Sequence, residues 1–283
     1  MQKDGFLVSA YGVRMPGIVY GTAWKKDRTA ALVEQAVSLG FRGIDTACQP
    51  KHYDEPGVGA GLAACTNAGL ERADLYLQSK FTPVDGQDPE RMPYDPKASL
   101  AEQVARSFES SLKNLRTSYL DCLILHSPLS KEKDTLDVWR AMETVFDGGG
   151  ARQLGISNCY RPELLERLYR WSRVKPAVVQ NRFYAETRYD REIREFCRQN
   201  RIVYQSFWTL TANPSILAHA TLRALAATHG RTPAQVFFRY LTQIGVVPLT
   251  GTASEAHMRE DLAIFEFELT PDQCAAVSGL LST

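Results

Sequence analysis

The sequence lacks a dominant charge, a long apolar run and any paired-cysteine motif. It has 33 Lys and Arg against 32 Asp and Glu, so a net charge of +1 argues against a nucleic-acid partner. No run of about eighteen apolar residues is present, which excludes a membrane-spanning helix and a membrane partner. The six cysteines form no CxxC pair and no metal-ligand spacing, and residues 1–5 contain no apolar signal core. We therefore expect reduced thiols, no metal and a cytoplasmic protein.

The composition that remains is that of an ordinary globular protein. Hydrophobic residues make up 44% of the 283 and charged residues 23%. One α/β barrel commonly uses about 250 residues as a single domain. No linker or repeat interrupts the sequence, so we expect one domain over residues 1–283.

Short apolar runs alternate with segments of helical spacing along the whole chain. The eight runs are 18–21, 43–45, 75–80, 120–126, 154–158, 177–181, 202–206 and 246–249. Nearly continuous apolar runs are typical of parallel strands that are buried on both faces. Between them, 29–39 and 99–115 place apolar residues on one helical face. No GxGxxG follows the first run, so we predict an α/β protein with a closed (β/α)₈ TIM barrel rather than an open nucleotide-binding sheet.

Polar residues follow several of these runs, where a barrel has its active-site mouth. Asp45, Lys80 and His126 end the second, third and fourth runs. Each residue alone is compatible with a structural role, as a helix cap, a rim charge or a core histidine. Three ionisable groups that converge on one mouth instead predict a site. Two long loops, 82–97 and 207–215, are expected to border it.

The lysine suggests what chemistry this site performs. An ammonium group stabilises a nearby anion, so we expect it to lower the pKa of a neighbouring phenol. A phenol of lowered pKa is a usable general acid near neutral pH. Tyr53, on the loop after Asp45, is the candidate.

These residues lie in segments that resemble the aldo-keto reductase superfamily. The segments are 40–47, 79–81, 123–128, 154–158, 179–181, 232–236 and 245–249, in the order and at about the spacing of that family. The resemblance runs from about residue 13 to 280. It implies a catalytic tetrad of Asp45, Tyr53, Lys80 and His126. It also implies NADP(H) or NAD(H) as cofactor, a small-molecule carbonyl substrate, and a monomer or weak dimer.

The resemblance also implies which residues contact the ligands, at the carboxyl ends of the strands. The implied cofactor-binding residues are Thr22, Asp45, Ser157, Asn158, Gln180, Ser206, Phe207, Leu210, Thr252, His257 and Asp261. Trp24, Phe81 and Trp208 are expected either to form an apolar substrate wall or to pack at the rim.

Two departures from the family concern the mouth. Pro50 stands at the family's usual tyrosine position, and Tyr53 is eight residues after Asp45, so its loop must be longer. Many members also stack an aromatic ring on the nicotinamide just after the seventh strand. Here Ser206 stands there, and either of the next two aromatic residues could replace the stacking ring.

A third departure concerns the cofactor's 2′-phosphate. The lysine and arginine that usually bind it align with Gly251 and His257, although Thr252 keeps a hydroxyl group. Charge-assisted bonds that favour NADPH are weakened without those cations. The sequence therefore leaves the choice between NADPH and NADH open.

Two other functions are compatible with the same residues. Lys80 could be a Schiff-base nucleophile of an aldolase, although this would need an uncharged amine, which the nearby Asp45 disfavours. The barrel could also be a redox-sensing or regulatory module that binds the cofactor with little turnover.

Overall fold

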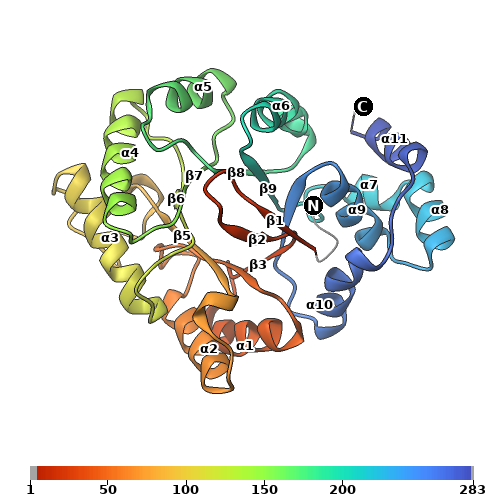
Figure 1. Ribbon diagram of the computed structural model, residues 1–283, viewed down its shortest axis with the longest axis horizontal. Coiled ribbons are helices and arrows are strands. Elements are labelled where there is room, and N and C mark those ends of the chain that lie inside the picture. Colours follow the sequence, from red (N-terminus) through yellow and green to blue (C-terminus); the bar gives the residue numbers. More distant parts are fainter. Residues whose placement is uncertain (1–4, 282–283) are drawn as a thin grey trace.

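Eight parallel strands close into a barrel in the computed structural model, which describes residues 5–281 (Figure 1). Neighbouring strands follow the chain order, and the last pairs with the first. The strands are β3 (Val19–Gly21), β4 (Gly43–Asp45), β5 (Tyr76–Phe81), β6 (Cys122–Leu125), β7 (Leu154–Ser157), β8 (Val178–Arg182), β9 (Val203–Phe207) and β10 (Val246–Thr250). The structure confirms the predicted (β/α)₈ barrel and the eight strand positions.

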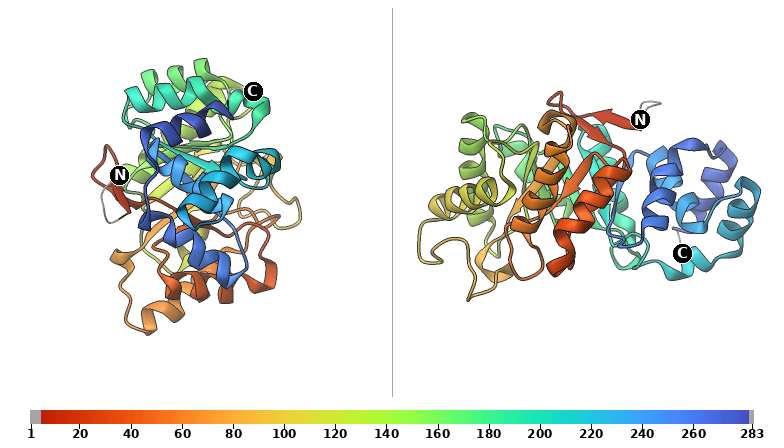
Figure 2. Two further views of the ribbon diagram at one scale, coloured as in Figure 1. Left: turned by 90° about the vertical axis from the view of Figure 1, so that its right-hand side faces the viewer. Right: turned by 90° about the horizontal axis from the view of Figure 1, so that it is seen from below.

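Helices surround this barrel (Figure 1). The α-helices are α1 (Thr29–Leu39), α2 (Glu55–Asn67), α3 (Leu100–Leu115), α4 (Glu132–Asp147), α5 (Pro162–Trp171), α6 (Arg191–Gln199), α7 (Pro214–Ala218), α8 (Ala220–His229), α9 (Pro233–Gln243), α10 (Glu255–Leu262) and α11 (Pro271–Gly279). Short 3₁₀ helices are η1 (Lys26–Arg28), η2 (Arg72–Asp74), η3 (Val84–Gly86), η4 (Ala185–Asp190) and η5 (Ala263–Glu266). Figure 2 shows the C-terminal helices as an outer group beside the barrel, where α11 packs on α8 and α9.

An antiparallel hairpin that the sequence analysis did not predict covers the amino-terminal end of the barrel. It consists of β1 (Phe6–Val8) and β2 (Arg14–Pro16). The buried side chain of Met15 packs with Val19, Tyr76 and Val178, which lie at or near the beginnings of their strands. The hairpin therefore closes the end of the barrel that is opposite the predicted mouth.

The barrel interior changes from apolar to polar toward the mouth. Apolar residues fill the part near the amino ends of the strands, and three glutamines lie between them and the carboxyl ends. Gln78 and Gln180 both donate from Nε2 to Oε1 of Gln205, each at 2.9 Å, and Gln205 donates back to Gln78 at 3.0 Å. These bonds satisfy polar groups that are costly to bury alone. They also form a floor under Asp45, which accepts from Gln78 and Gln180.

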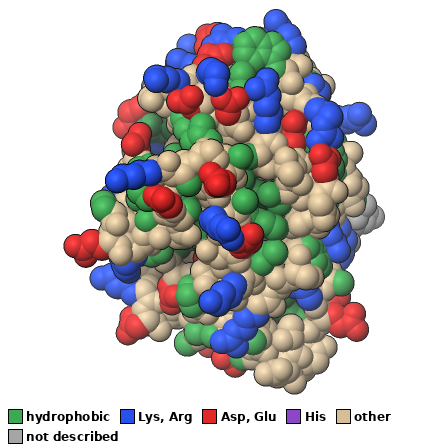
Figure 3. Space-filling model, turned by 90° about the vertical axis from the view of Figure 1, so that its left-hand side faces the viewer, with side chains coloured by type: hydrophobic (Ala, Val, Ile, Leu, Met, Phe, Trp, Pro, Cys, Tyr) green, Lys and Arg blue, Asp and Glu red, His purple; other side chains and the backbone are tan. Residues whose placement is uncertain are grey.

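The surface carries charges of both signs. Lys and Arg alternate with Asp and Glu over the face shown in Figure 3. Between residues 5 and 281, no helix is long and apolar enough to cross a bilayer. The predicted domain ends, at residues 1 and 283, lie outside the described residues.

Candidate active site

A buried ion pair lies at the carboxyl ends of β4 and β5. Lys80 Nζ donates to Asp45 Oδ1 at 2.7 Å, to Oδ2 at 2.8 Å and to the carbonyl oxygen of Thr46 at 2.9 Å. Lys80 is only 1% exposed. All three protons of the ammonium group therefore have acceptors in the protein, and the carboxylate balances the charge.

The longer loop after β4 brings Tyr53 to this pair. Lys80 Nζ lies 5.1 Å from the centroid of the Tyr53 ring. The loop turns tightly before Tyr53, since the backbone amides of His52 and Tyr53 both donate to the carbonyl of Gln49. Asp54 then caps α2 by accepting from the amide of Gly57 at 3.0 Å. The extra residues are taken up in this turn, so the longer spacing still places Tyr53 beside Lys80.

The pKa of the Tyr53 phenol corrects one sequence expectation. Burial raises this pKa and is the largest influence on it, while the Lys80 ammonium acts in the opposite direction. The net shift is upward, not downward as we expected. Burial alone would lower the pKa of Lys80, but Asp45 and Tyr53 outweigh it and raise that pKa. At neutral pH the site therefore holds a protonated phenol beside a charged ammonium.

His126 completes the cluster from the end of β6. Its ring meets that of Tyr53 edge to face at 5.9 Å between centroids. Burial, followed by the charges of Lys80 and His52, lowers the pKa of His126 well below its usual range. Its imidazole is consequently neutral at pH 7. The structure thus brings all four predicted catalytic residues together.

Four predicted cofactor residues hold the strand ends to one another. Thr22 donates to the carbonyl of Asp45 from both its amide and its hydroxyl, at 3.0 and 2.9 Å. Ser157 donates to the carbonyl of Gln180 at 2.7 Å. Asn158 has a left-handed backbone (φ 53°) and donates to the carbonyl of His126 at 2.9 Å. The NH₂ of Gln180 is used within the barrel, by Asp45 and Gln205.

The segment after β9 contains the predicted stacking and substrate residues. Ser206 is buried and accepts a hydrogen bond from Thr209 at 2.9 Å, whereas Phe207 and Leu210 are half-buried. Trp208 is 50% exposed with a left-handed backbone (φ 55°), and its ring packs against the guanidinium of Arg182. Trp208 is thus the more accessible of the two aromatic rings.

The turn after β10 carries the residues predicted for the phosphate end of the cofactor. Thr252 accepts from the amide of Ser254 at 3.1 Å and lies 3.5 Å from Nδ1 of His257. Asp261 is buried and accepts from the Thr250 hydroxyl at 2.7 Å, and burial raises its pKa to about 6. Asp261 thus points into the protein interior.

Lys25 also reaches this turn, and it is not among the residues that the sequence predicted for the site. Its amine donates to the carbonyl of Gly251, and a Cβ added at Gly251 would lie 3.5 Å from Nζ. Burial, with the nearby Arg28, lowers the pKa of Lys25. Within residues 5–281 it forms no ion pair. The amine of Lys25 therefore lies beside the glycine where the family usually has a lysine.

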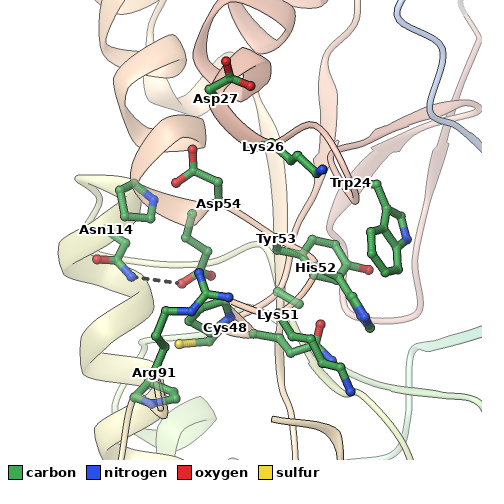
Figure 4. A pocket seen from close by; sticks show the side chains of 16 residues that line it. Trp24, Lys26, Asp27, Cys48, Lys51, His52, Tyr53, Asp54, Arg91 and Asn114 are labelled. Carbon is green, nitrogen blue, oxygen red and sulfur yellow. Dashed lines mark hydrogen bonds between the residues drawn. The ribbon is translucent and has the colours of Figure 1, made fainter. Parts of the chain in front are cut away.

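A cavity of about 620 Å³ opens beside the Tyr53 loop (Figure 4). Its lining includes Trp24, His52, Tyr53, Arg91 and Asn114, but not Lys80 or His126. It therefore extends outward from Tyr53, toward α2 and α3, rather than over the strand ends.

The two remaining predicted wall residues differ in exposure. Trp24 is 58% exposed and stacks on His52, with 3.9 Å between ring centroids. Phe81 is 1% exposed and packs against Tyr94, so it does not reach the surface of the mouth. Its neighbour Thr82 does contact the site, since its hydroxyl lies 2.7 Å from Nδ1 of His126. Its place directly after Lys80 and Phe81 was the only sequence signal for it.

A single closed barrel of eight parallel strands, as seen here, is shared with a class of oxidoreductases. The model of the Aldo/keto reductase family matches residues 10–282, and the chain belongs to that family. Glyoxal reductase of Bacillus subtilis is 31% identical over 272 residues, which cover 95% of this chain and 90% of that protein. NADPH-dependent codeinone reductase 1-4 of Papaver somniferum is 27% identical and covers 99% and 91%. The crystal structure of an aldo/keto reductase from Brucella melitensis has a TM-score of 0.82 at 27% identity, covering 97% and 98%.

Proposed function

We propose that the protein catalyses NAD(P)H-dependent reduction of an aldehyde or ketone to an alcohol, with Tyr53 as the general acid. The observation that carries this proposal is the Lys80 ammonium, fixed by Asp45 and facing the Tyr53 ring beside His126. Reduction of a carbonyl group places negative charge on its oxygen. A proton donor with a fixed cation behind it is the arrangement that such a reaction needs.

Tyr53 would give its proton to the carbonyl oxygen. Burial raises its pKa, so the phenol is still protonated when the substrate binds and can donate that proton during reduction. Lys80 then stabilises the phenolate that forms, and Asp45 holds the ammonium in place. The neutral His126 can hydrogen-bond the carbonyl oxygen without adding a charge.

The residues at the mouth fit a nicotinamide dinucleotide. Such a cofactor supplies a hydride to the carbonyl carbon when it is bound. Ser157, Asn158 and the oxygen of Gln180 provide the polar groups that a carboxamide requires. Thr22 and Asp45 lie near them at the ends of β3 and β4.

The other end of the cofactor would lie at the turn after β10. Thr252 offers a hydroxyl, His257 an imidazole and Lys25 an amine beside Gly251. This set suits a phosphate group, and one relative is NADPH-dependent by name. We therefore propose NADP(H) as the cofactor, with NAD(H) as a weaker alternative.

The accessible aromatic rings suggest the substrate class. Trp24 and Trp208 are each at least half exposed, and they offer apolar walls to a small carbonyl compound. The aldolase alternative is weaker, because a Schiff base needs a neutral amine. Lys80 donates to three acceptors, and its pKa is raised.

The first test replaces the proposed acid. We expect Tyr53→Phe to lower kcat for carbonyl-dependent NADPH oxidation by at least about 100-fold, the usual contribution of a general acid. Binding of NADPH, measured by quenching of tryptophan fluorescence, should change little. A panel of small aldehydes and ketones would be assayed with NADPH and with NADH.

Tyr119→Phe is the matched control. Tyr119 precedes β6, at the opposite end of the barrel, and its ring packs against Arg72 and Arg152. This variant should keep the wild-type rate. Equal activity of the wild type and Tyr53→Phe would contradict the role of Tyr53. Cofactor binding without turnover in the wild type would favour the regulatory module instead.

A further inference from the structure

The two ring nitrogens of His126 have different surroundings. Nδ1 lies 2.7 Å from the hydroxyl of Thr82, whereas Nε2 makes no hydrogen bond with residues 5–281. The residue is half-buried beside the ring of Tyr53. A neutral imidazole carries one proton, so its ability to donate at the mouth depends on which nitrogen holds that proton.

Thr82 is held firmly in place. It is 2% exposed, and its carbonyl oxygen accepts from Tyr94 at 2.6 Å and from Gln87 at 3.2 Å. Its hydroxyl has one hydrogen-bond partner in the described chain, Nδ1 of His126.

Only one direction of this bond satisfies both partners. If Nδ1 carried the proton and donated it, the buried Thr82 hydroxyl would have no acceptor for its own proton. If Thr82 donates to Nδ1, the hydroxyl is satisfied and the imidazole proton is on Nε2. Unsatisfied buried donors are disfavoured, so the second arrangement prevails.

We propose that Thr82 is a positioning residue that fixes the proton of His126 on Nε2, where it can be donated to a carbonyl oxygen. This inference rests on the proposed reductase function. Thr82 acts through His126, the hydrogen-bond partner of its hydroxyl. The titratable groups that face His126 are Tyr53, Lys80 and His52. None of them contacts Nδ1 in the described residues, so Thr82 alone controls that nitrogen.

The test measures the tautomer without turnover. ¹⁵N NMR of the cofactor-free protein labelled at histidine distinguishes Nδ1–H from Nε2–H, and the His126 signals are assigned by their loss in His126→Gln. The wild type should show the proton on Nε2. Thr82→Val keeps the shape but removes the hydroxyl, and it should give a mixture of tautomers. Thr82→Ser keeps the hydroxyl and should restore the Nε2–H form.

Kinetics provide the second measurement. Thr82→Val should lower kcat for carbonyl reduction about tenfold, the value of one lost hydrogen bond, with a smaller change in KM. Thr82→Ser should recover most of this rate. A wild type with the proton on Nδ1 would overturn the proposal. So would an unchanged tautomer in Thr82→Val, or a changed tautomer without loss of kcat.

The NMR result is independent of the proposed function. A wild type that reduces no carbonyl compound would overturn the reductase proposal and, with it, the catalytic use of the Nε2 proton. The Thr82–His126 hydrogen bond itself would still be decided by the tautomer. Failure of the reductase proposal and failure of the Thr82 proposal therefore give different results.

Discussion

Among single residues, Lys80 is held by hydrogen bonds on every side of its ammonium group. Its ammonium is enclosed by two carboxylate oxygens and one carbonyl, and its pKa is raised above an already high ordinary value. It therefore stays charged across the whole physiological pH range. Its effect on Tyr53 is constant over that range, and any pH dependence of turnover near neutrality must arise from other groups.

Lys25 leads to a prediction about cofactor choice. We expect Lys25→Met to weaken binding of NADPH about tenfold, since a hydrogen bond to a charged group contributes about 1.5 kcal/mol or more. NADH, which lacks the 2′-phosphate, should be affected less. Fluorescence titration of both cofactors would measure the change in their affinity ratio.

The neighbouring Lys26 provides the control. Its side chain is exposed and lines the cavity beside the Tyr53 loop, and it does not contact Gly251. Lys26→Met should leave the affinity ratio close to that of the wild type. An equal loss of affinity for NADPH and NADH in Lys25→Met would show that the amine does not bind the 2′-phosphate.

At the scale of residues, strand position was enough to predict that three ionisable groups would meet. Asp45, Lys80 and His126 each end an apolar run, so a closed barrel had to bring them together. Lys25 and Thr82 were missed because their contacts depend on the paths of loops. Trp24 has a left-handed backbone (φ 64°), and this bend, just before Lys25, leaves no periodic signal in the sequence.

Among the elements, two loops support each other around Tyr53. Gln49 in the β4–α2 loop donates to the carbonyl of Gly86 at 2.6 Å, and Gln87 in the β5–α3 loop donates to the carbonyl of Cys48 at 2.9 Å. Glu55, at the start of α2, accepts from Ser79 and Ser111. The long Tyr53 loop is thus held at both of its ends.

The close contact between α2 and α3 can be tested at Gly59. A Cβ at this position would lie 2.0 Å from the carbonyl oxygen of Asn114, which is backbone and cannot move alone. We expect Gly59→Ala to lower the free energy of unfolding by about 1–3 kcal/mol through overpacking. Urea denaturation would measure this loss.

Gly279 is the matched glycine, in α11. A Cβ there meets no atom within 4 Å. Gly279→Ala should be neutral or stabilising by up to about 1 kcal/mol, because alanine favours helices. Similar stabilities for the two variants would contradict the packing argument.

The hydrogen bond between Thr250 of β10 and Asp261 of α10 should make the free energy of unfolding depend on pH. Burial raises the pKa of Asp261 to about 6 in the folded state, from an ordinary 3.8. The buried, protonated Asp261 contributes fully to the free energy of unfolding below about pH 4, and this contribution is lost as the pH rises through about 6. The total loss of unfolding free energy is at most about 3 kcal/mol. Asp261→Asn cannot ionise and still offers an acceptor to Thr250.

The measurement compares this variant with the wild type at two pH values. Between pH 4 and pH 7.5, the unfolding free energy of Asp261→Asn should rise relative to that of the wild type by about 2–3 kcal/mol. Other titrating groups, including Glu55, are common to both proteins and cancel. A difference that stays constant with pH would refute the burial effect at Asp261.

Element prediction failed for the β1–β2 hairpin. β1 and β2 are as short as the barrel strands β3 and β4, at three residues each, but β3 and β4 belong to the alternation of strands and helices that predicts the barrel. β1 and β2 pair only with each other, outside that alternation. Their role, covering the end of the barrel, exists only after the barrel has closed. The sequence alone therefore contains no periodic signal for them.

For the whole molecule, the two ends of the barrel have separate tasks. Chemistry gathers at the carboxyl ends of the strands, and packing at the amino ends supports stability. Met15 is fully buried in the plug that the hairpin forms, and its Sδ accepts from Gln205 Nε2 at 3.5 Å. Between Met15 and the mouth lie Gln78, Gln180 and Gln205, which form a glutamine layer. This layer supports Asp45 through Gln78 and Gln180.

This division predicts a loss of stability without a matching loss of activity. Met15→Ala should lower the free energy of unfolding by about 2–5 kcal/mol, since it leaves a cavity in the plug. Met15→Leu keeps the volume and should cost less than about 1.5 kcal/mol. At a temperature where Met15→Ala is folded, its kcat/KM for carbonyl reduction should stay within about threefold of the wild type, because the glutamine layer can keep its own hydrogen bonds. Urea denaturation and NADPH oxidation on the same preparations would decide the matter. A large loss of kcat/KM in fully folded Met15→Ala would mean that the plug acts on the mouth through Gln205, and that the two ends are coupled.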